Sequence, residues 1–145
     1  MTALTLSAND ISASEERGAI ISQYITSADV VLGQAVYLDS NNQVSPAKAD
    51  SSAHANAIGI AVIADNFYGE TTIKSGGTAG VVVYGPVWGF SGLTSGEQGW
   101  VDKTTAGTIT DTAPTGGAYQ YAVGRAIDSE TFFVDPGTTT PLSHA

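Results

Sequence analysis

The chain has 145 residues and no cysteine, with 14 acidic residues against 5 lysines and arginines. This length suits one core, so we expect a single domain or two fused half-domains. The absence of cysteine excludes disulfides, thiolate metal sites and cysteine nucleophiles. A net charge of −9 argues against a nucleic-acid partner, because phosphate contacts need clustered lysines and arginines. No apolar run approaches the ~20 residues of a membrane-spanning helix, so we expect no membrane partner either.

Charged residues make up only 13% of the chain, roughly half the share of ~25% that is usual in soluble domains. Glycine and small polar residues take their place, which predicts a smooth and weakly charged surface. Such a surface favours broad contact with other proteins. The acidic balance by itself is explained by solubility.

Residues 1–17 are polar and small, with weak periodicity, and they predict a flexible N-terminal arm. Ser12 followed by Glu15 also fits a capping box, and Gly18 fits the end of a short helix. A short helix therefore stays open as an alternative within this arm.

From Gly18 onward the chain is rich in β-branched and aromatic residues, in short runs separated by turns. The strand-like runs of the first part read "GAIISQYI", "QAVYLD", "AIGIAVIA", "TTIK" and "TAGVVVYG". Pro46 makes a central strand unfavourable in the loop that begins "VSPAKAD". The segment Gly76–Gly80, "GGTAG", looks superficially like a phosphate-binding loop, but it lacks the following Lys-Ser/Thr and leads into a strand pattern, so we reject that interpretation.

A phrase of the first part recurs in the second. "LGQAVYLDS" at residues 32–40 matches "SGEQGWVDK" at residues 95–103 with an offset of 63 residues. Within "NAIGIAVIAD" and "YQYAVGRAID", the segment "IGIAV" at residues 58–62 matches "VGRAI" at residues 123–127 with an offset of 65. Matched positions are Gly33/Gly96, Gln34/Glu97, Tyr37/Trp100, Leu38/Val101, Asp39/Asp102, Ile58/Val123, Gly59/Gly124, Ala61/Ala126 and Val62/Ile127. Two blocks in the same order with nearly equal spacing indicate a duplicated unit.

The duplication predicts an all-β fold, a compact barrel or sandwich built from two repeated half-units that share one core. We expect the N-terminal arm over residues 1–17, the duplicated β domain over 18–135 and a C-terminal tail over 136–145. The halves would span about 18–90 and 91–135. One half alone would bury too little apolar surface to offset the entropy of its chain.

The repeated glycines carry structural expectations. Gly33 and Gly96 precede a strand and suit a turn conformation that other residues rarely adopt. Gly59 and Gly124 lie inside strands, where they indicate a bulge or the close approach of another backbone.

The repeated carboxylates Asp39 and Asp102 invite a metal-binding or acid–base interpretation. Neither is accompanied by a histidine or a third carboxylate, so we expect both to end a strand and to accept hydrogen bonds from the turn that follows. The sequence predicts no catalytic, cofactor-binding or metal-binding residue.

The two histidines are the remaining candidates for general base. His144 lies in the predicted tail. His54 lies in "SSAHANA", next to Ser51 and Ser52, and has no counterpart in the second half. We interpret it as a surface-loop histidine, with a hydrolase as the alternative.

Aromatic side chains are a further candidate, because sugar-binding β-sandwiches use aromatic faces. The set comprises Tyr68, Tyr84, Trp88, Phe90 and Trp100. Trp100 matches Tyr37 in the repeat, which favours core packing for it. Trp88 and Phe90 lie between the halves, where they either seal the junction or form an exposed contact patch.

The repeated pattern resembles the capsid decoration (head-stabilising, cement) proteins of tailed bacteriophages. In that family a Gly-x-x-Val-Tyr-x-Asp strand is followed by "V-x-P-A" and by Ile-Gly-Val-Ala. The residues that carry the resemblance are Gly33, Val36, Tyr37, Asp39, Val44, Pro46, Ala47, Ile58, Gly59 and Ala61. It covers about residues 20–135.

The resemblance implies a non-enzymatic structural virion protein on the outer surface of the capsid, which stabilises the expanded head by bridging subunits of the major capsid protein. It also implies a homo-oligomer, with a trimer favoured. The alternative function is a carbohydrate- or host-surface-binding β module of a phage particle, based on Tyr84, Trp88 and Phe90.

Overall fold

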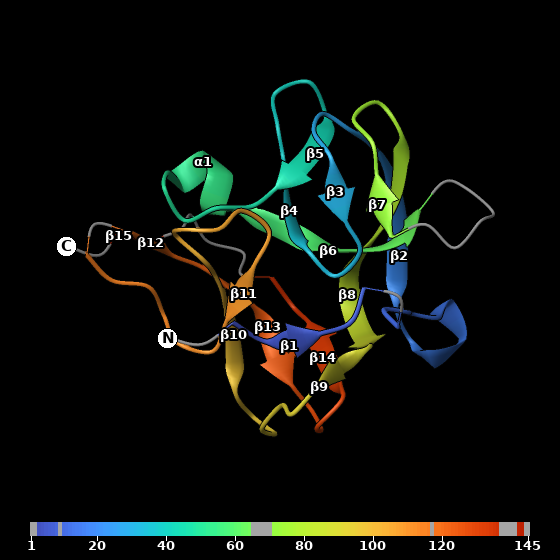
Figure 1. Ribbon diagram of the computed structural model, residues 1–145, viewed down its shortest axis with the longest axis vertical. Helices are drawn as coiled ribbons and strands as arrows, with labels where there is room; N and C mark the ends of the chain where they lie inside the picture. The colour runs from blue at the N-terminus through green and yellow to red at the C-terminus, as the bar shows by residue number, and fades with distance from the viewer. Residues whose placement is uncertain (1–2, 9, 65–70, 117, 137–141, 144–145) are drawn as a thin grey trace.

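The computed structural model describes residues 3–8, 10–64, 71–116, 118–136 and 142–143, and it is built almost entirely of β-strands (Figure 1). Its elements, in chain order, are β1 (Thr5–Leu6), η1 (Glu15–Arg17), β2 (Ile20–Thr26), β3 (Val30–Val31), β4 (Ala35–Leu38), β5 (Gln43–Pro46), α1 (Ser52–Ala55), β6 (Ala57–Ala64), β7 (Thr72–Ile73), β8 (Thr78–Trp88), β9 (Phe90–Ser91), β10 (Gln98–Val101), β11 (Ile109–Thr110), β12 (Tyr119–Gln120), β13 (Ala122–Ala126), β14 (Thr131–Val134) and β15 (Leu142–Ser143). The predicted all-β class is confirmed.

The first half forms a closed barrel of five strands. Its order is β8-β2-β5-β4-β6, and β6 returns to β8 to complete the ring. β2 and β5 run parallel, whereas the other neighbours are antiparallel. The fully buried Val36, Ile60 and Val81 belong to three of these strands. The alternating and apolar runs of the sequence thus provide the barrel wall and its core.

The second half repeats the same strand order. The series β11-β10-β13-β14-β8 matches β5-β4-β6-β8-β2 of the first half. β8 is shared between the halves: its residues 78–84 pair with β2 and β6, and its residues 85–88 pair with β14. Pro46 lies in β5, against the expectation from the sequence, and Pro86 lies in β8. Each proline is tolerated because its residue pairs with a neighbouring strand on one side only.

The repeat extends to the backbone pairing. The equivalent strands β4 and β10 have a register shift at the same place, between Val36 and Tyr37 in β4 and between Gly99 and Trp100 in β10. The strand partners also correspond: Val36↔Gly59 with Gly99↔Gly124, and Tyr37↔Ala57 with Trp100↔Ala122. Matching bulges indicate that the duplicated phrase encodes the same local strand geometry twice.

The turn glycines behave as predicted. Gly33 and Gly96 have φ angles of +94° and +87°. Their N–H groups donate to the equivalent carbonyls of Ala61 and Ala126, both at 2.8 Å. A residue with a side chain would be strained at either position.

The strand glycines also behave as predicted, because another backbone approaches each of them. A Cβ at Gly59 would lie 2.0 Å from the carbonyl oxygen of Val82, and one at Gly124 would lie 2.0 Å from that of Phe133. The duplication therefore preserves a close strand crossing in both halves.

Backbone hydrogen bonds interlock the two halves. Gly107, in the turn before β11, accepts from the N–H of Ala35 at 3.0 Å and donates to the carbonyl of Ala47 at 2.7 Å. Ala49 donates to the carbonyl of Asp102 at 2.8 Å. The turn after β10 is thus hydrogen-bonded to the first barrel, so the halves form one body.

The N-terminal segment differs from the flexible arm that the sequence predicts. Of residues 1–17, the structure describes 3–8 and 10–17, and β1 crosses the second half beside β9 (Figure 1). β1 pairs with β9, Ala3 forms a bridge with Thr110, and Ile11 is only 5% exposed. η1 covers three residues and ends at Gly18, as the helical alternative predicts, but its N-cap is Ser14. Of the C-terminal tail, β15 pairs with β12.

Replacing Gly124 or Gly59 with alanine is expected to lower the free energy of unfolding by about 1–3 kcal/mol or more, because the new Cβ overlaps a carbonyl oxygen in a packed strand pair. Urea denaturation measures this change. Thr104→Ala, in an exposed turn, serves as the control and is expected to stay near wild type. An unchanged urea midpoint for Gly124→Ala would contradict the close crossing.

Candidate functional site

His54 lies on α1, a four-residue helix at the surface, and its side chain is 47% exposed. Its Nδ1 lies 2.9 Å from Oδ1 of Asp50, and its ring is 4.9 Å from that of Tyr37. Ser51 caps the helix, its Oγ accepting from the backbone N–H of His54 at 3.2 Å. The neighbouring hydroxyl thus supports the helix end instead of facing the imidazole as a nucleophile. His144 lies outside the described residues.

The partner of His54 was not identified from the sequence. Asp50 precedes His54 by four residues, and that spacing brings the two side chains together on a helical turn. The spacing was a usable signal, although the helix is too short to be predicted from periodicity. Both side chains are about half exposed, 47% for His54 and 44% for Asp50, so this pair lies at the surface.

The repeated aspartates have the structural role that we expected. Oδ1 of Asp39 accepts from the backbone N–H groups of Asn41 at 2.8 Å and Gln43 at 3.0 Å. Oδ2 of Asp102 accepts from the N–H of Thr105 at 3.0 Å. Each carboxylate therefore organises the turn after its strand.

Turn hydrogen bonds also shift the acidity of three aspartates. The N–H of Gln43 is the main cause of a lowered pKa at Asp39, that of Ser75 at Asp29, and that of Glu130 at Asp128. These shifts stabilise carboxylates as anions and prepare none of the three as a proton donor near neutral pH. Within the described part of the chain, no group of three acidic or histidine residues is placed to hold a metal ion.

The aromatic set divides between core and surface. Phe90 is 3% exposed and packs against Phe132 with ring centroids 5.6 Å apart, so it seals the second half. Trp88 is half-buried, with the guanidinium of Arg17 4.9 Å from the ring centroid. Trp100 is half-buried in β10, which falls short of the full burial that core packing implies. Tyr68 lies outside the described residues.

An apolar patch lies where the two halves meet, formed by Ile20, Tyr84 and Phe133. Ile20 and Tyr84 are partners across β2 and β8 and are 55% and 45% exposed. The ring of Tyr84 meets that of Phe133 edge-on at 5.1 Å. The exposed Arg125 is the strand partner of Phe133 on β13. We call this surface the junction patch; its composition resembles the centre of a protein interface.

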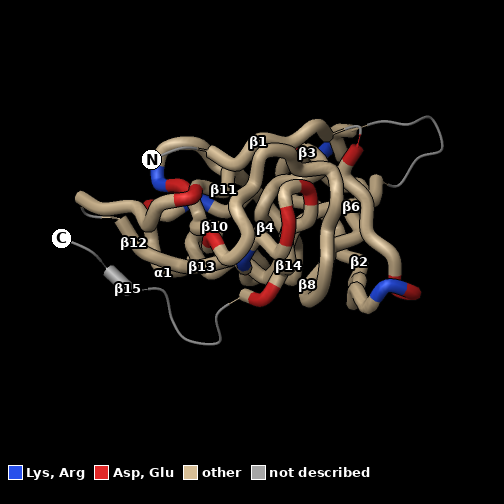
Figure 2. The backbone as a smooth tube through the Cα atoms, turned by 90° about the horizontal axis from the view of Figure 1, so that it is seen from below, with Lys and Arg blue, Asp and Glu red and all other residues tan. Residues whose placement is uncertain are grey.

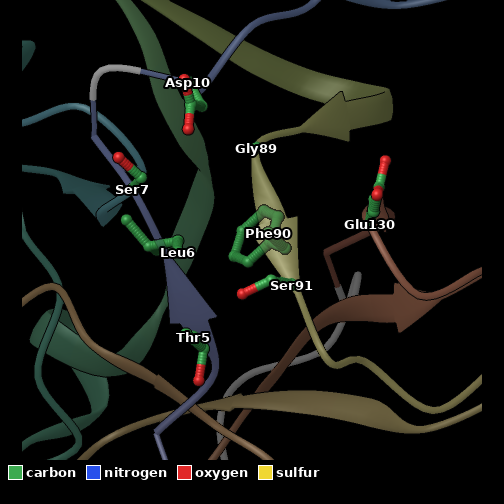
Figure 3. Close-up of a pocket in the computed structure, with 8 residues that line it drawn as sticks. All are labelled: Thr5, Leu6, Ser7, Asp10, Gly89, Phe90, Ser91 and Glu130. Carbon is green, nitrogen blue, oxygen red and sulfur yellow. The ribbon is translucent and has the colours of Figure 1, made fainter.

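A pocket with a volume of about 560 Å³ lies between the arm and β9, as Figure 3 shows. It is lined by Thr5, Leu6, Ser7, Asp10, Gly89, Phe90, Ser91 and Glu130. Hydroxyls, two separate carboxylates and one aromatic ring line it, with no imidazole to act as a base. This pocket therefore marks how the arm lies against the second half.

A comparison of the sequence with protein-family models and with curated proteins finds no match. Among the described residues, no helix combines the length and hydropathy needed to cross a membrane.

Asp128→Ala is expected to lower the free energy of unfolding at pH 7 and to make that free energy fall less steeply as the pH is lowered. Because the pKa of Asp128 is lower in the folded chain, its contribution is present above the unfolded value of about 3.9 and is lost as pH falls through the folded value. Urea unfolding between pH 7 and pH 2.5 measures both effects. Ser129→Ala, in the same exposed turn, should keep the wild-type dependence; an equal acid dependence in both variants would contradict the assignment.

Proposed function

We propose that this chain is a capsid decoration protein, a non-enzymatic clip on the outer surface of a phage head. The observation that carries the proposal is the duplicated β unit, in which the decoration-like phrase builds the same strand, bulge and turn twice. Its partner would be the major capsid protein, bound by a homo-oligomer, with a trimer favoured. The proposed family rests on the resemblance of the sequence pattern. The proposed binding to capsid subunits is supported by the composition of the surface.

The surface favours contact over chemistry. Figure 2 shows charged residues scattered sparsely along a chain that is mostly neither acidic nor basic. The carboxylates of Asp39 and Asp102 accept hydrogen bonds in turns, and the imidazole of His54 contacts Asp50. The junction patch, by contrast, leaves Ile20 and Tyr84 about half exposed on β2 and on β8, the strand that both halves share. Burying it against a capsid subunit would gain apolar contact area without exposing a loop.

A clip of this kind gains strength from valency. The pressure of a packaged genome pulls neighbouring capsid subunits apart, and a decoration protein resists by spanning their seam. One weak contact per copy is enough when copies associate, because each later contact in the oligomer forms intramolecularly.

Purified protein is expected to co-sediment with expanded heads that lack it and to raise their resistance to heat. Tyr84→Ala should weaken this binding about tenfold or more if the junction patch is the central contact. His54→Ala, with an equally exposed side chain elsewhere, should bind like wild type. The proposal fails if no protein sediments with the heads and their heat resistance is unchanged.

The second candidate, a carbohydrate- or host-surface-binding module, is favoured by the partial exposure of Tyr84 and Trp88 near each other along β8. It predicts binding to a glycan array or to whole bacteria that is lost in Trp88→Ala while the circular dichroism spectrum is unchanged. Glycan binding together with failure to bind heads would favour this function over the first.

A further inference from the structure

The second half lacks a strand pairing that the first half has. In the first barrel, β2 and β5 close the ring directly, with Ile25 paired to Gln43 and Thr26 to Val44. The corresponding neighbours in the second half, β8–β9 and β11, do not pair with each other. The arm lies between them instead, so an N-terminal segment completes the part of the fold that is encoded last (Figure 1).

The arm makes few backbone hydrogen bonds in this position, and Leu4 and Leu6 are partly buried against the core. β1 contributes two residues to its pairing with β9. On the β11 side, Leu4 donates its N–H to the carbonyl of Ile109 at 2.9 Å, and Ser7 donates to that of Gly89 at 3.2 Å. An open pocket of about 560 Å³ lies beside the arm at β9 and another of about 270 Å³ beside it at β3 and β11. The arm closes the edges without filling the space around them.

The chain has a hinge next to this segment. The N–H of Asp10 donates to the carbonyl of Ser7 at 2.9 Å, so the backbone turns there. Beyond the turn the chain is anchored: Ile11 is buried, and Ser12 and Trp88 exchange two backbone hydrogen bonds of 3.1 and 2.9 Å. Residues 3–6 can therefore leave the groove while the chain from Ile11 onward stays in place.

We propose that the arm exchanges between two copies of this chain, so that residues 3–6 of each copy close the groove between β9 and β11 of the other. An identical arm fits because it repeats every contact that the chain makes with itself: Thr5 against Ser91, Leu6 against Phe90, and Ala3 against Thr110. An empty groove would leave β9 and β11 as open edges, which favours rapid capture of a second strand. The hinge turn is the element that opens, as in domain swapping. This inference is independent of the capsid role.

Disulfide trapping tests the exchange, because the chain contains no cysteine to interfere. Thr5→Cys and Ser91→Cys, strand partners in the register of β1 and β9, are placed on separate chains, one of them tagged. The two chains are mixed, unfolded together in urea, refolded at high protein concentration and oxidised. Exchange predicts a disulfide-linked heterodimer whose yield rises with concentration.

The matched control replaces Ser91→Cys by Ser40→Cys, on the exposed turn between β4 and β5. We expect the yield of heterodimer with Ser91→Cys to exceed that of the control several-fold. A single chain carrying Thr5→Cys and Ser91→Cys verifies the pairing by forming an internal disulfide at low concentration. If the internal disulfide forms but the two mixtures give equal yields of heterodimer, the proposal is overturned. That result is expected if the groove binds only the arm of its own chain, or a strand of another protein.

A second variant tests the hinge without any crosslink. Deleting Ala8 shortens the turn between Ser7 and Asp10, and a connection too short to fold back favours exchange over closure within one chain. Sedimentation is expected to show a larger dimer fraction than in wild type at equal concentration. A deletion variant that refolds purely as a monomer would contradict arm exchange.

Discussion

The rest of the structure depends on β8, because this one strand belongs to both repeats. Along residues 78–84 it closes the first barrel between β2 and β6, and along 85–88 it forms the edge to which β14 pairs. The turn at Gly107 adds hydrogen bonds between the halves at a separate place. The duplicated sequence thus forms one body, in which the strand that completes the first barrel is also the partner of β14 in the second half.

The residues that the two copies share have structural roles. Repeated positions are occupied by residues that determine the backbone conformation, such as the turn glycine Gly33 and the turn carboxylate Asp39. The duplication therefore repeated turns and strands. What remains for interaction are strand faces and edges. In the two proposals, the junction patch would bind a partner through its side chains. The groove that holds the arm would bind a strand through backbone hydrogen bonds at its edges.

Much of the fold was predictable from the repeat, since equal spacing identified the strands, the turn glycines and the close strand crossings. The arm was not, because β1 has two residues and its pairing depends on edges formed 85 residues later, which local periodicity cannot report. β8 extends past the predicted strand-like run, which ends at Gly85, because Pro86 disfavours a central strand but is tolerated here where it pairs with β14 alone. For the candidate site, the Asp50–His54 contact needed a short helix that no pattern predicts.

The continuity of β8 also decides how the molecule responds to mechanical load. Eleven residues of extended backbone span about 36 Å, so a force that draws the two halves apart acts along a covalent strand that both halves share. Its hydrogen bonds to β2 and β6 are then loaded in shear and must slip together, whereas a peeling force would break them singly. Stiffness in tension is therefore built into the chain path itself.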